Sequence, residues 1–105
     1  MAKKITMDSV HAFIDGKPFN RENMSVTISD NNTVHLRLHG NAIATRMSDG
    51  KVYINTCGWF TNTTKERLNY LLYTLNSALV IRQKNWSWYL GDKPWDGEWT
   101  YVNKN

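Results

Sequence analysis

The sequence predicts an α+β fold: an antiparallel β meander with one amphipathic helix packed on one face, followed by a tryptophan-rich β hairpin near the C-terminus. Three observations predict this fold. Apolar and polar residues alternate over residues 24–56, four leucines then recur at helical spacing, and short strand-like runs between turn residues follow. A chain of 105 residues can build one modest core, so we expect a single domain over residues 1–105.

The strands of the meander are expected where polarity alternates between turn signals. Met24, Val26 and Ile28 alternate with hydroxyl side chains, and the runs that follow repeat this pattern. Residues 30–32, 40–41 and 48–50 consist of Asp, Asn, Ser and Gly, so the chain is expected to turn there. The predicted strands are therefore 24–29, 34–39, 42–47 and 51–56, paired in antiparallel order.

A single helix is expected over residues 64–76. Leu68, Leu71, Leu72 and Leu75 fall at i, i+3, i+4 and i+7 and form one apolar stripe. This stripe needs an apolar surface to pack on, and the alternating residues of the meander provide one. The residues of that surface are Val26, Ile28, Val34, Leu36, Leu38, Val52 and Ile54.

The start of this helix carries the signature of a capping box. Thr63 and Glu66 are three residues apart, as this motif requires. The threonine oxygen would accept from the first turn of backbone N–H groups, and the glutamate would reach back to the chain before the helix. The simplest interpretation of residues 58–69 is that they only start a helix.

Strands are also expected at residues 79–83, 86–90 and 98–102. Lys84 and Asn85 form the predicted turn of the hairpin, so Trp86 and Trp88 would share one buried face, and most tryptophans would pack inside. Pro18 and Pro94 occupy two similar Lys-Pro-aromatic segments. A proline cannot donate to a central ladder, so both segments should lie at strand ends or sheet edges.

The second face of the meander is the leading candidate for a binding surface. If the helix covers one face, the other remains open to solvent or to a partner. The alternation places five side chains there: His35, Arg37, His39, Arg46 and Tyr53.

The net charge of +4 is concentrated in the middle of the chain. Residues 33–90 carry +5, residues 1–32 carry zero and residues 91–105 carry −1. This distribution favours a folded basic face over a disordered nucleic-acid-binding arm. The alternative is an ordinary solvated surface, because small domains often carry a charge of this size.

Composition also bears on the compartment. No apolar run approaches the roughly 18 residues of a membrane span, and no apolar segment follows the basic start of the chain. Cys57 is the only cysteine, so an internal disulfide is excluded. We expect a reducing, cytosolic setting.

The sequence carries no recognisable catalytic motif, metal site or cofactor motif. Four residues of strand would separate His35 from His39 by roughly 13 Å, which is too far to share a zinc ion. No nucleophile signature surrounds Cys57, and no phosphate loop or dinucleotide glycine motif is present. The acidic residues near the C-terminus lie in turns: Asp92, Asp96 and Glu98. We predict that the protein is not an enzyme and needs no cofactor or metal.

Four segments together resemble a family of small accessory proteins of tailed bacteriophages. The resemblance covers about residues 34–102, and the pattern runs as His-Gly-Asn-x-Ile-Ala, Gly-Trp-x-Thr-x-Thr-Thr-x-x-Arg-Leu-Asn and a C-terminal Trp-Asp-Gly. The segments are 39–44, 58–69, 83–90 and 95–99. The chain departs from the pattern by extra aromatic bulk at Phe60, Tyr70 and Tyr73. The resemblance implies a viral protein in the bacterial cytoplasm and implies no reaction.

Two binding functions follow. The first is inhibition or modulation of a host or defence protein, as the resemblance implies; five Trp and five Tyr support it, because these residues dominate protein interfaces. The second is binding of single-stranded nucleic acid by interleaved basic and aromatic residues. These residues are Arg37, Arg46, Tyr53, Trp59, Lys65, Arg67, Arg82, Lys84, Trp86 and Trp88. A variant of this hypothesis places Lys65 and Arg67, with the free N–H groups at the helix start, on a phosphate. A homodimer through an edge strand is a third arrangement to test.

Overall fold

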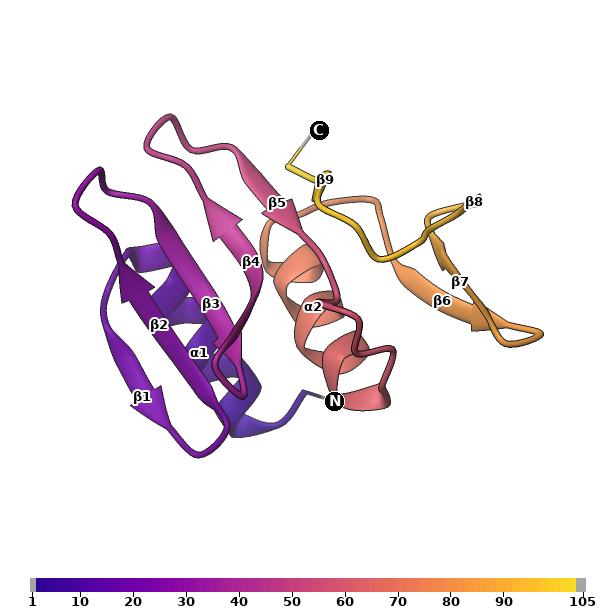
Figure 1. Cartoon of the computed structure of the whole chain (residues 1–105), viewed down its shortest axis with the longest axis horizontal. Helices are drawn as coiled ribbons and strands as arrows, with labels where there is room; N and C mark the ends of the chain where they lie inside the picture. Colours follow the sequence, from indigo (N-terminus) through magenta and orange to yellow (C-terminus); the bar gives the residue numbers. More distant parts are fainter. Residues whose placement is uncertain (1, 104–105) are drawn as a thin grey trace.

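The computed structural model describes residues 2–103 and shows a six-stranded antiparallel sheet with two helices on one face (Figure 1). The sheet has the order β1-β2-β3-β4-β5-β9, and a separate three-stranded sheet has the order β6-β7-β8. This arrangement confirms the predicted α+β class. The elements are α1 (Lys4–Asp15), β1 (Phe19–Arg21), β2 (Met24–Ile28), β3 (Val34–Leu38), β4 (Asn41–Arg46), β5 (Val52–Ile54), α2 (Asn62–Thr74), β6 (Ile81–Lys84), β7 (Ser87–Leu90), β8 (Lys93–Pro94) and β9 (Thr100–Tyr101).

Helix α1 was not predicted, and the expectation of a single helix is wrong. Its buried face combines apolar Val10 and Phe13 with polar Thr6 and Ser9. These hydroxyl residues interrupt the apolar stripe by which a helix is recognised in a sequence. The helix ends at Gly16, which adopts the left-handed conformation with φ +69° and donates its N–H to the last turn.

Helix α2 begins two residues earlier than predicted and uses another cap. Thr61, not Thr63, is the N-cap, and its hydroxyl accepts from the Thr64 backbone N–H at 3.2 Å. The predicted capping box is therefore wrong. Glu66 is not available to it, because its carboxylate accepts from Thr6 of α1 and from the Lys3 backbone N–H.

The leucine stripe of α2 packs inside, as predicted. Leu68, Leu71 and Leu72 are at most 1% exposed, and Leu75 is partly buried beside them. Leu36 and Leu38 of β3 are buried in the same core. Burial of such side chains is the main term that stabilises the arrangement. The apolar sheet face is thus covered, although Ile28 at the end of β2 remains 40% exposed.

The prolines lie where the sequence predicts them. Pro18 immediately precedes β1 at one edge of the large sheet, and Pro94 lies in β8 at one edge of the small sheet. The two edge strands themselves were not predicted, because they are only three and two residues long. Among residues 2–103, the structure contains no helix that is long and apolar enough to cross a membrane.

The small sheet turns one residue later than predicted. Asn85 and Trp86 both have positive φ, 51° and 69°, and form the two-residue turn between β6 and β7. Trp86 therefore lies at the tip of the hairpin and is 92% exposed, whereas Trp88 within β7 is 5% exposed. Trp59 and Trp99 are also exposed, so the expectation that most tryptophans pack inside is wrong.

Candidate functional site

One face of the six-stranded sheet is not covered by either helix (Figure 1). Directly paired residues of antiparallel strands share a face, so the strand register assigns side chains to it. Thr27 pairs with His35, His35 pairs with Thr45, and Thr45 pairs with Tyr53. Tyr53 pairs in turn with Tyr101. Arg37 lies two residues after His35 on the same strand and therefore on the same side. We define the open face as the surface of these residues: Thr27, His35, Arg37, Thr45, Tyr53 and Tyr101.

The open face carries little charge. Its one guanidinium, that of Arg37, donates to the Thr27 hydroxyl at 3.0 Å and to the Gly40 carbonyl at 3.2 Å. Burial, and then the charge of Arg37, lower the pKa of His35, whose Nδ1 lies 3.2 Å from the Thr45 hydroxyl. The imidazole is therefore neutral at pH 7. None of the strands of this sheet contains Asp or Glu.

Aromatic side chains gather at the β5–β9 end of the open face. The rings of Tyr53 and Tyr101 are 5.6 Å apart between centroids and tilted by 52°. A shallow hollow of about 240 Å³ is lined by Thr45, Met47, Tyr53 and Trp99. Met47 and Trp99 are 41% and 49% exposed. We call Met47, Tyr53, Trp99 and Tyr101 the aromatic end.

Arg46 does not lie on the open face, and its predicted position is wrong. It pairs with Val34, whose side chain is buried under the helices, so Arg46 shares the helix-covered face. A Cβ atom at Gly16, at the end of α1, would lie 3.0 Å from the Arg46 guanidinium. This position brings a cation to the C-terminus of a helix, where the helix dipole favours it.

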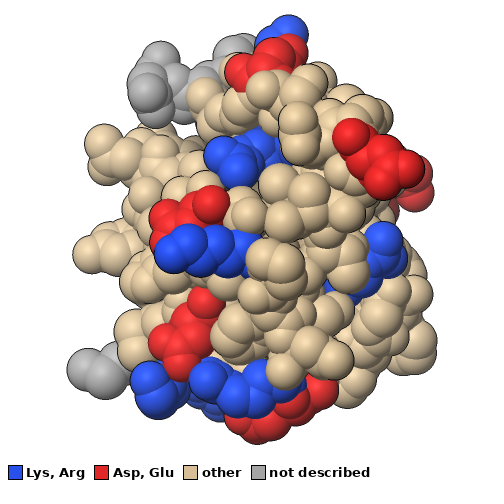
Figure 2. Space-filling view, turned by 90° about the vertical axis from the view of Figure 1, so that its left-hand side faces the viewer, with Lys and Arg blue, Asp and Glu red and all other residues tan. Residues whose placement is uncertain are grey.

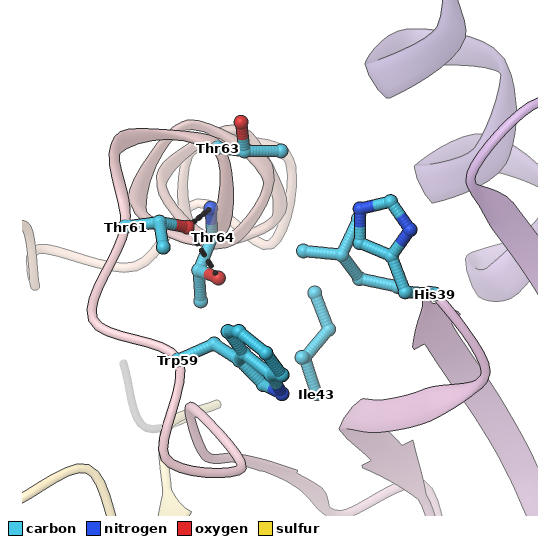
Figure 3. Close-up of a pocket in the computed structure, with 7 residues that line it drawn as sticks. His39, Ile43, Trp59, Thr61, Thr63 and Thr64 are labelled. Carbon is cyan, nitrogen blue, oxygen red and sulfur yellow. Dashed lines mark hydrogen bonds between the residues drawn. The ribbon is translucent and has the colours of Figure 1, made fainter.

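His39 lies in a turn, so the prediction that it shares a face with His35 is wrong. His39 and Gly40 have positive φ, 52° and 81°, and connect β3 to β4. The turn ends the alternation of β3 and brings the imidazole to the start of α2. There it borders a pocket of about 230 Å³ with Trp59 and Thr63 (Figure 3). The other lining residues are Leu38, Ile43, Thr61 and Thr64.

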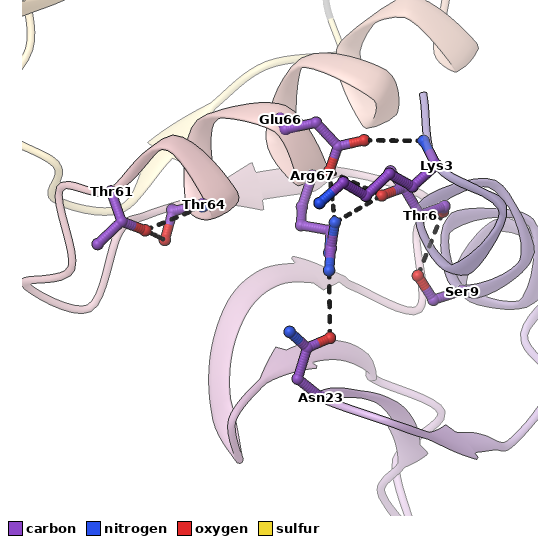
Figure 4. Close-up of polar contacts among 8 residues, drawn as sticks. All are labelled: Lys3, Thr6, Ser9, Asn23, Thr61, Thr64, Glu66 and Arg67. Carbon is purple, nitrogen blue, oxygen red and sulfur yellow. Dashed lines mark hydrogen bonds and ion pairs between the residues drawn. The ribbon is translucent and has the colours of Figure 1, made fainter. Parts of the chain in front are cut away.

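Arg67 lies in the interior, so its predicted role as a surface contact is wrong. Its side chain is only 4% exposed. The guanidinium donates to Thr6 of α1 at 2.8 Å and to Asn23 of the β1–β2 turn at 3.2 Å, and it pairs with Glu66 (Figure 4). Arg67 thus holds two helices and a turn together.

The same cluster determines the charge of Glu66. Partial burial raises its pKa, but hydrogen bonds from Thr6 and Arg67 outweigh this effect, and the pKa lies below its ordinary value. The carboxylate is therefore ionised and paired at neutral pH. Lys65, one residue before Glu66, does not belong to this cluster and places its ammonium 5.9 Å from the centre of the Trp88 ring.

Residues 58–69 act mainly as structural residues. Thr61 caps α2, Thr64 is fully buried in its first turn, and Arg67 connects α2 to α1 by its hydrogen bond to Thr6. Asn69 uses its amide to donate to the Ile81 carbonyl and accepts from the Ile81 N–H, at 3.0 and 2.7 Å. These contacts explain residues 61–69 through packing and hydrogen bonding, beyond the start of a helix that the sequence indicates.

The opposite edge of the molecule has mixed charge. Figure 2 shows blue and red side chains close together on this side. Asp8 of α1 forms ion pairs with Lys4 and with Arg21 of β1, at 3.2 and 2.7 Å. Hydrogen bonds from Arg21 and then Lys4 lower the pKa of Asp8. A surface with both signs interspersed attracts neither polyanions nor polycations strongly.

Side chains that could bind a metal ion or act in catalysis do not lie close together in the part of the chain that the structure describes. Across residues 2–103, no three His, Cys, Asp or Glu residues lie close enough to hold a metal ion. Cys57 is exposed in a turn with φ +54°, and its thiol donates to the Ala42 carbonyl at 2.9 Å. His11 lies on α1, where its Nε2 is 3.1 Å from the Tyr70 hydroxyl.

Of the eight residues predicted for binding, the structure brings His35, Arg37 and Tyr53 together. Sequence reasoning missed their aromatic neighbours Trp99 and Tyr101. These two residues are spaced by two within a predicted strand, which is the signal for a shared face. The pairing of that strand with β5 could not be deduced, because the helix and the small sheet separate the two in sequence.

Comparison with known proteins gives one match. A family model described as Kyanoviridae Gp96 protein matches residues 2–105, which is nearly the whole chain. No curated protein and no solved structure matches the chain. The match agrees with the resemblance to phage proteins and carries no statement of activity.

Proposed function

We infer, since the chain belongs to the Kyanoviridae Gp96 protein family of cyanophages, that it is a phage-encoded binding protein without catalytic activity. It acts in the host cytoplasm on a host or defence protein, which it inhibits or modulates. The open face is the contact surface, and the aromatic end is its centre. The observation that carries this proposal is an uncovered sheet face with exposed aromatic side chains and almost no charge.

The composition of the aromatic end fits a protein partner. Tyr, Trp and Met are enriched at protein interfaces, where the buried centre is depleted of charged residues. Trp99 and Met47 are both more than 40% exposed and stand beside the half-buried Tyr53 and Tyr101. Two rings held against one another lose little conformational freedom on binding.

The charge of the open face argues against nucleic acid at this surface. Binding to a phosphate backbone depends on Lys and Arg side chains that are free to neutralise phosphates. Arg37 is the only strand cation on this face, and it already donates to Thr27 and Gly40. His35 is neutral at pH 7, as its lowered pKa requires.

A protein that binds without catalysis changes its partner in a limited number of ways. It can block a surface of the partner, or it can stabilise one conformation of the partner over another. Both amount to inhibition or modulation. The hollow at the aromatic end would receive an apolar side chain of the partner, because three of its four lining residues, Met47, Tyr53 and Trp99, are large and apolar or aromatic and none is charged.

The experiment is affinity capture from a cyanobacterial lysate with the wild-type chain and two matched variants. Trp99→Ala removes a ring of the aromatic end, and Tyr73→Ala removes a ring that is 77% exposed on α2. We expect one host protein to be enriched by the wild type and by Tyr73→Ala. Its affinity for Trp99→Ala should fall at least thirtyfold, as for an interface hot spot of about 2 kcal/mol.

Salt and oligomeric state complete the test. Capture through an uncharged aromatic surface should change little between about 50 and 200 mM salt. The proposal is wrong if no host protein is enriched above controls, or if both variants lose the captured protein equally. If the wild-type chain is a dimer and Trp99→Ala is a monomer, the partner of the aromatic end is a second copy of this chain and not a host protein.

A further inference from the structure

The tip of the β6–β7 hairpin carries a tryptophan that the fold does not use. Trp86 is 92% exposed, the largest exposed fraction among the large hydrophobic residues of the described chain. Its φ of +69° places it in the left-handed region, which side chains of this size rarely adopt. A glycine would suit this turn position better. The advantage of a tryptophan here therefore lies outside the fold.

The surroundings of Trp86 are basic. Arg82 and Lys84 are exposed on β6, and Lys84 pairs with Ser87 directly beside the turn. No Asp or Glu occurs between residues 67 and 91. One acidic residue from a later part of the chain lies near the hairpin: Asp96 lines a shallow groove together with Ser87.

The register aligns these side chains on one surface. Arg82 pairs with Tyr89 and Lys84 pairs with Ser87, so both cations share a face with the half-buried Tyr89 ring. Residues two apart in a strand are separated by about 6.6 Å, which allows the two cations to contact successive phosphates of an extended strand. Trp86 belongs to the turn that joins β6 to β7, and this turn lies at the end of the molecule farthest from β1 (Figure 1).

We propose that the β6–β7 hairpin binds single-stranded nucleic acid, with a base stacked on Trp86 and phosphates on Arg82 and Lys84. Base stacking on an aromatic ring is tolerant of sequence, because every base has a π face. Two cations and a ring, on a hairpin whose own residues include no acid, fit a polyanion with flat groups. This site is separate from the aromatic end and does not depend on the proposed function.

The test measures binding of fluorescein-labelled 12-mers of dT and of rU by fluorescence anisotropy. With two phosphate contacts, the affinity of the wild type should fall about sevenfold between 50 and 200 mM salt. Trp86→Gly should weaken binding at least about tenfold at each salt concentration and leave the salt dependence unchanged. Arg82→Gln with Lys84→Gln should flatten the salt dependence.

Matched variants control for general charge and aromatic content. Lys51→Gln removes an exposed cation of the β4–β5 turn, and Tyr73→Ala removes a ring of α2 that is 77% exposed. Both should bind as the wild type does. Thermal unfolding of Trp86→Gly should occur at the wild-type temperature or above it, which separates loss of contact from loss of fold.

The outcomes are distinct. Tighter binding of dT or of rU identifies DNA or RNA as the ligand, and either result supports the proposal. Absence of binding at 50 mM salt, wild-type affinity of Trp86→Gly, or equal binding of a blunt duplex overturns it. Polyglutamate that competes as strongly as the oligonucleotide would identify an acidic polypeptide as the ligand and would also overturn it.

Discussion

Replacing Arg67 by Met tests whether this cation is structural or available to a ligand. Methionine retains most of the apolar stem and removes the guanidinium. The change eliminates hydrogen bonds to Thr6 and Asn23 and the ion pair with Glu66. Removing one partner of a buried ion pair costs about 3–5 kcal/mol.

Two features of the structure reduce this figure. The Glu66 side chain is 29% exposed, so water can solvate the carboxylate after its partner is removed. The Arg67 Nε atom is buried without a hydrogen-bond partner, and its removal relieves a desolvation cost of about 1 kcal/mol or more. We therefore expect Arg67→Met to lower the free energy of unfolding by about 2–3 kcal/mol.

The assay is thermal unfolding followed by circular dichroism, with Arg82→Met as the matched variant. A loss of 2–3 kcal/mol corresponds to roughly 10–20 °C for a domain of this size. Arg82 is exposed on β6, so its replacement should change stability by less than about 0.5 kcal/mol. Equal effects of the two substitutions would refute the structural role and restore Arg67 as a candidate ligand for phosphate.

A pH series checks the same cluster independently. The folded-state pKa of Glu66 is lowered, so its contribution to stability is present above the unfolded value of about 4.5 and is lost as pH falls through the folded pKa. In Arg67→Met, burial still raises the pKa while one opposing hydrogen bond is gone. The loss of stability below pH 5 should therefore be smaller than in the wild type.

Three further predictions concern other parts of the fold. Gly97 has φ +83°, and a methyl group there would overlap the Thr56 hydroxyl, so Gly97→Ala should lower the free energy of unfolding in urea by at least about 3 kcal/mol. Gly50 has φ +91° but open space around it, so Gly50→Ala should cost only about 1–2 kcal/mol, and equal costs would contradict the packing at Gly97. The pKa of His35 is lowered in the folded chain, so the unfolded chain binds a proton near pH 6.5 more readily, and the free energy of unfolding should fall from about pH 7.5 to 5.5. His35→Gln should reduce that fall in matched urea titrations, and an unchanged pH dependence would show that His35 is freely solvated. Trp86→Gly should raise stability by roughly 0.5–1 kcal/mol by relieving a left-handed tryptophan, measured by thermal unfolding, and a loss of stability would mean that the ring contributes to folding.

Much of the fold could be predicted because burial imposes regular spacing. The leucines of α2 and the alternating residues of β2 and β3 are core residues, and their periods of 3.6 and 2 are visible in the sequence. Alternation fails at turns and irregular pairings. The register of β3 and β4 shifts between Leu36 and Arg37, which puts Arg46 opposite Val34, and the turn at His39 ends the strand.

The tryptophans illustrate the limits of local reasoning. Trp86 and Trp88 have the spacing of a shared strand face, yet one is exposed and the other is buried. A displacement of the turn by a single residue decides this difference, because it moves Trp86 out of the strand. The sequence already placed Trp86 among candidate nucleic-acid contacts, but only the register shows that it is exposed at the tip of the hairpin.

The sequence by itself determined the α+β class, the leucine face of α2 and the edge positions of the two prolines. Each follows from the periodicity of burial or from the missing N–H of proline, which are local properties of the chain. The tertiary structure decided which charges face solvent. Thr6 accepts a hydrogen bond from Arg67, 61 residues later in the chain. Both residues are polar and would be expected at the surface, yet this contact lets them pack together in the interior. Contacts over such separations leave no periodic trace, because each depends on how the two helices pack together.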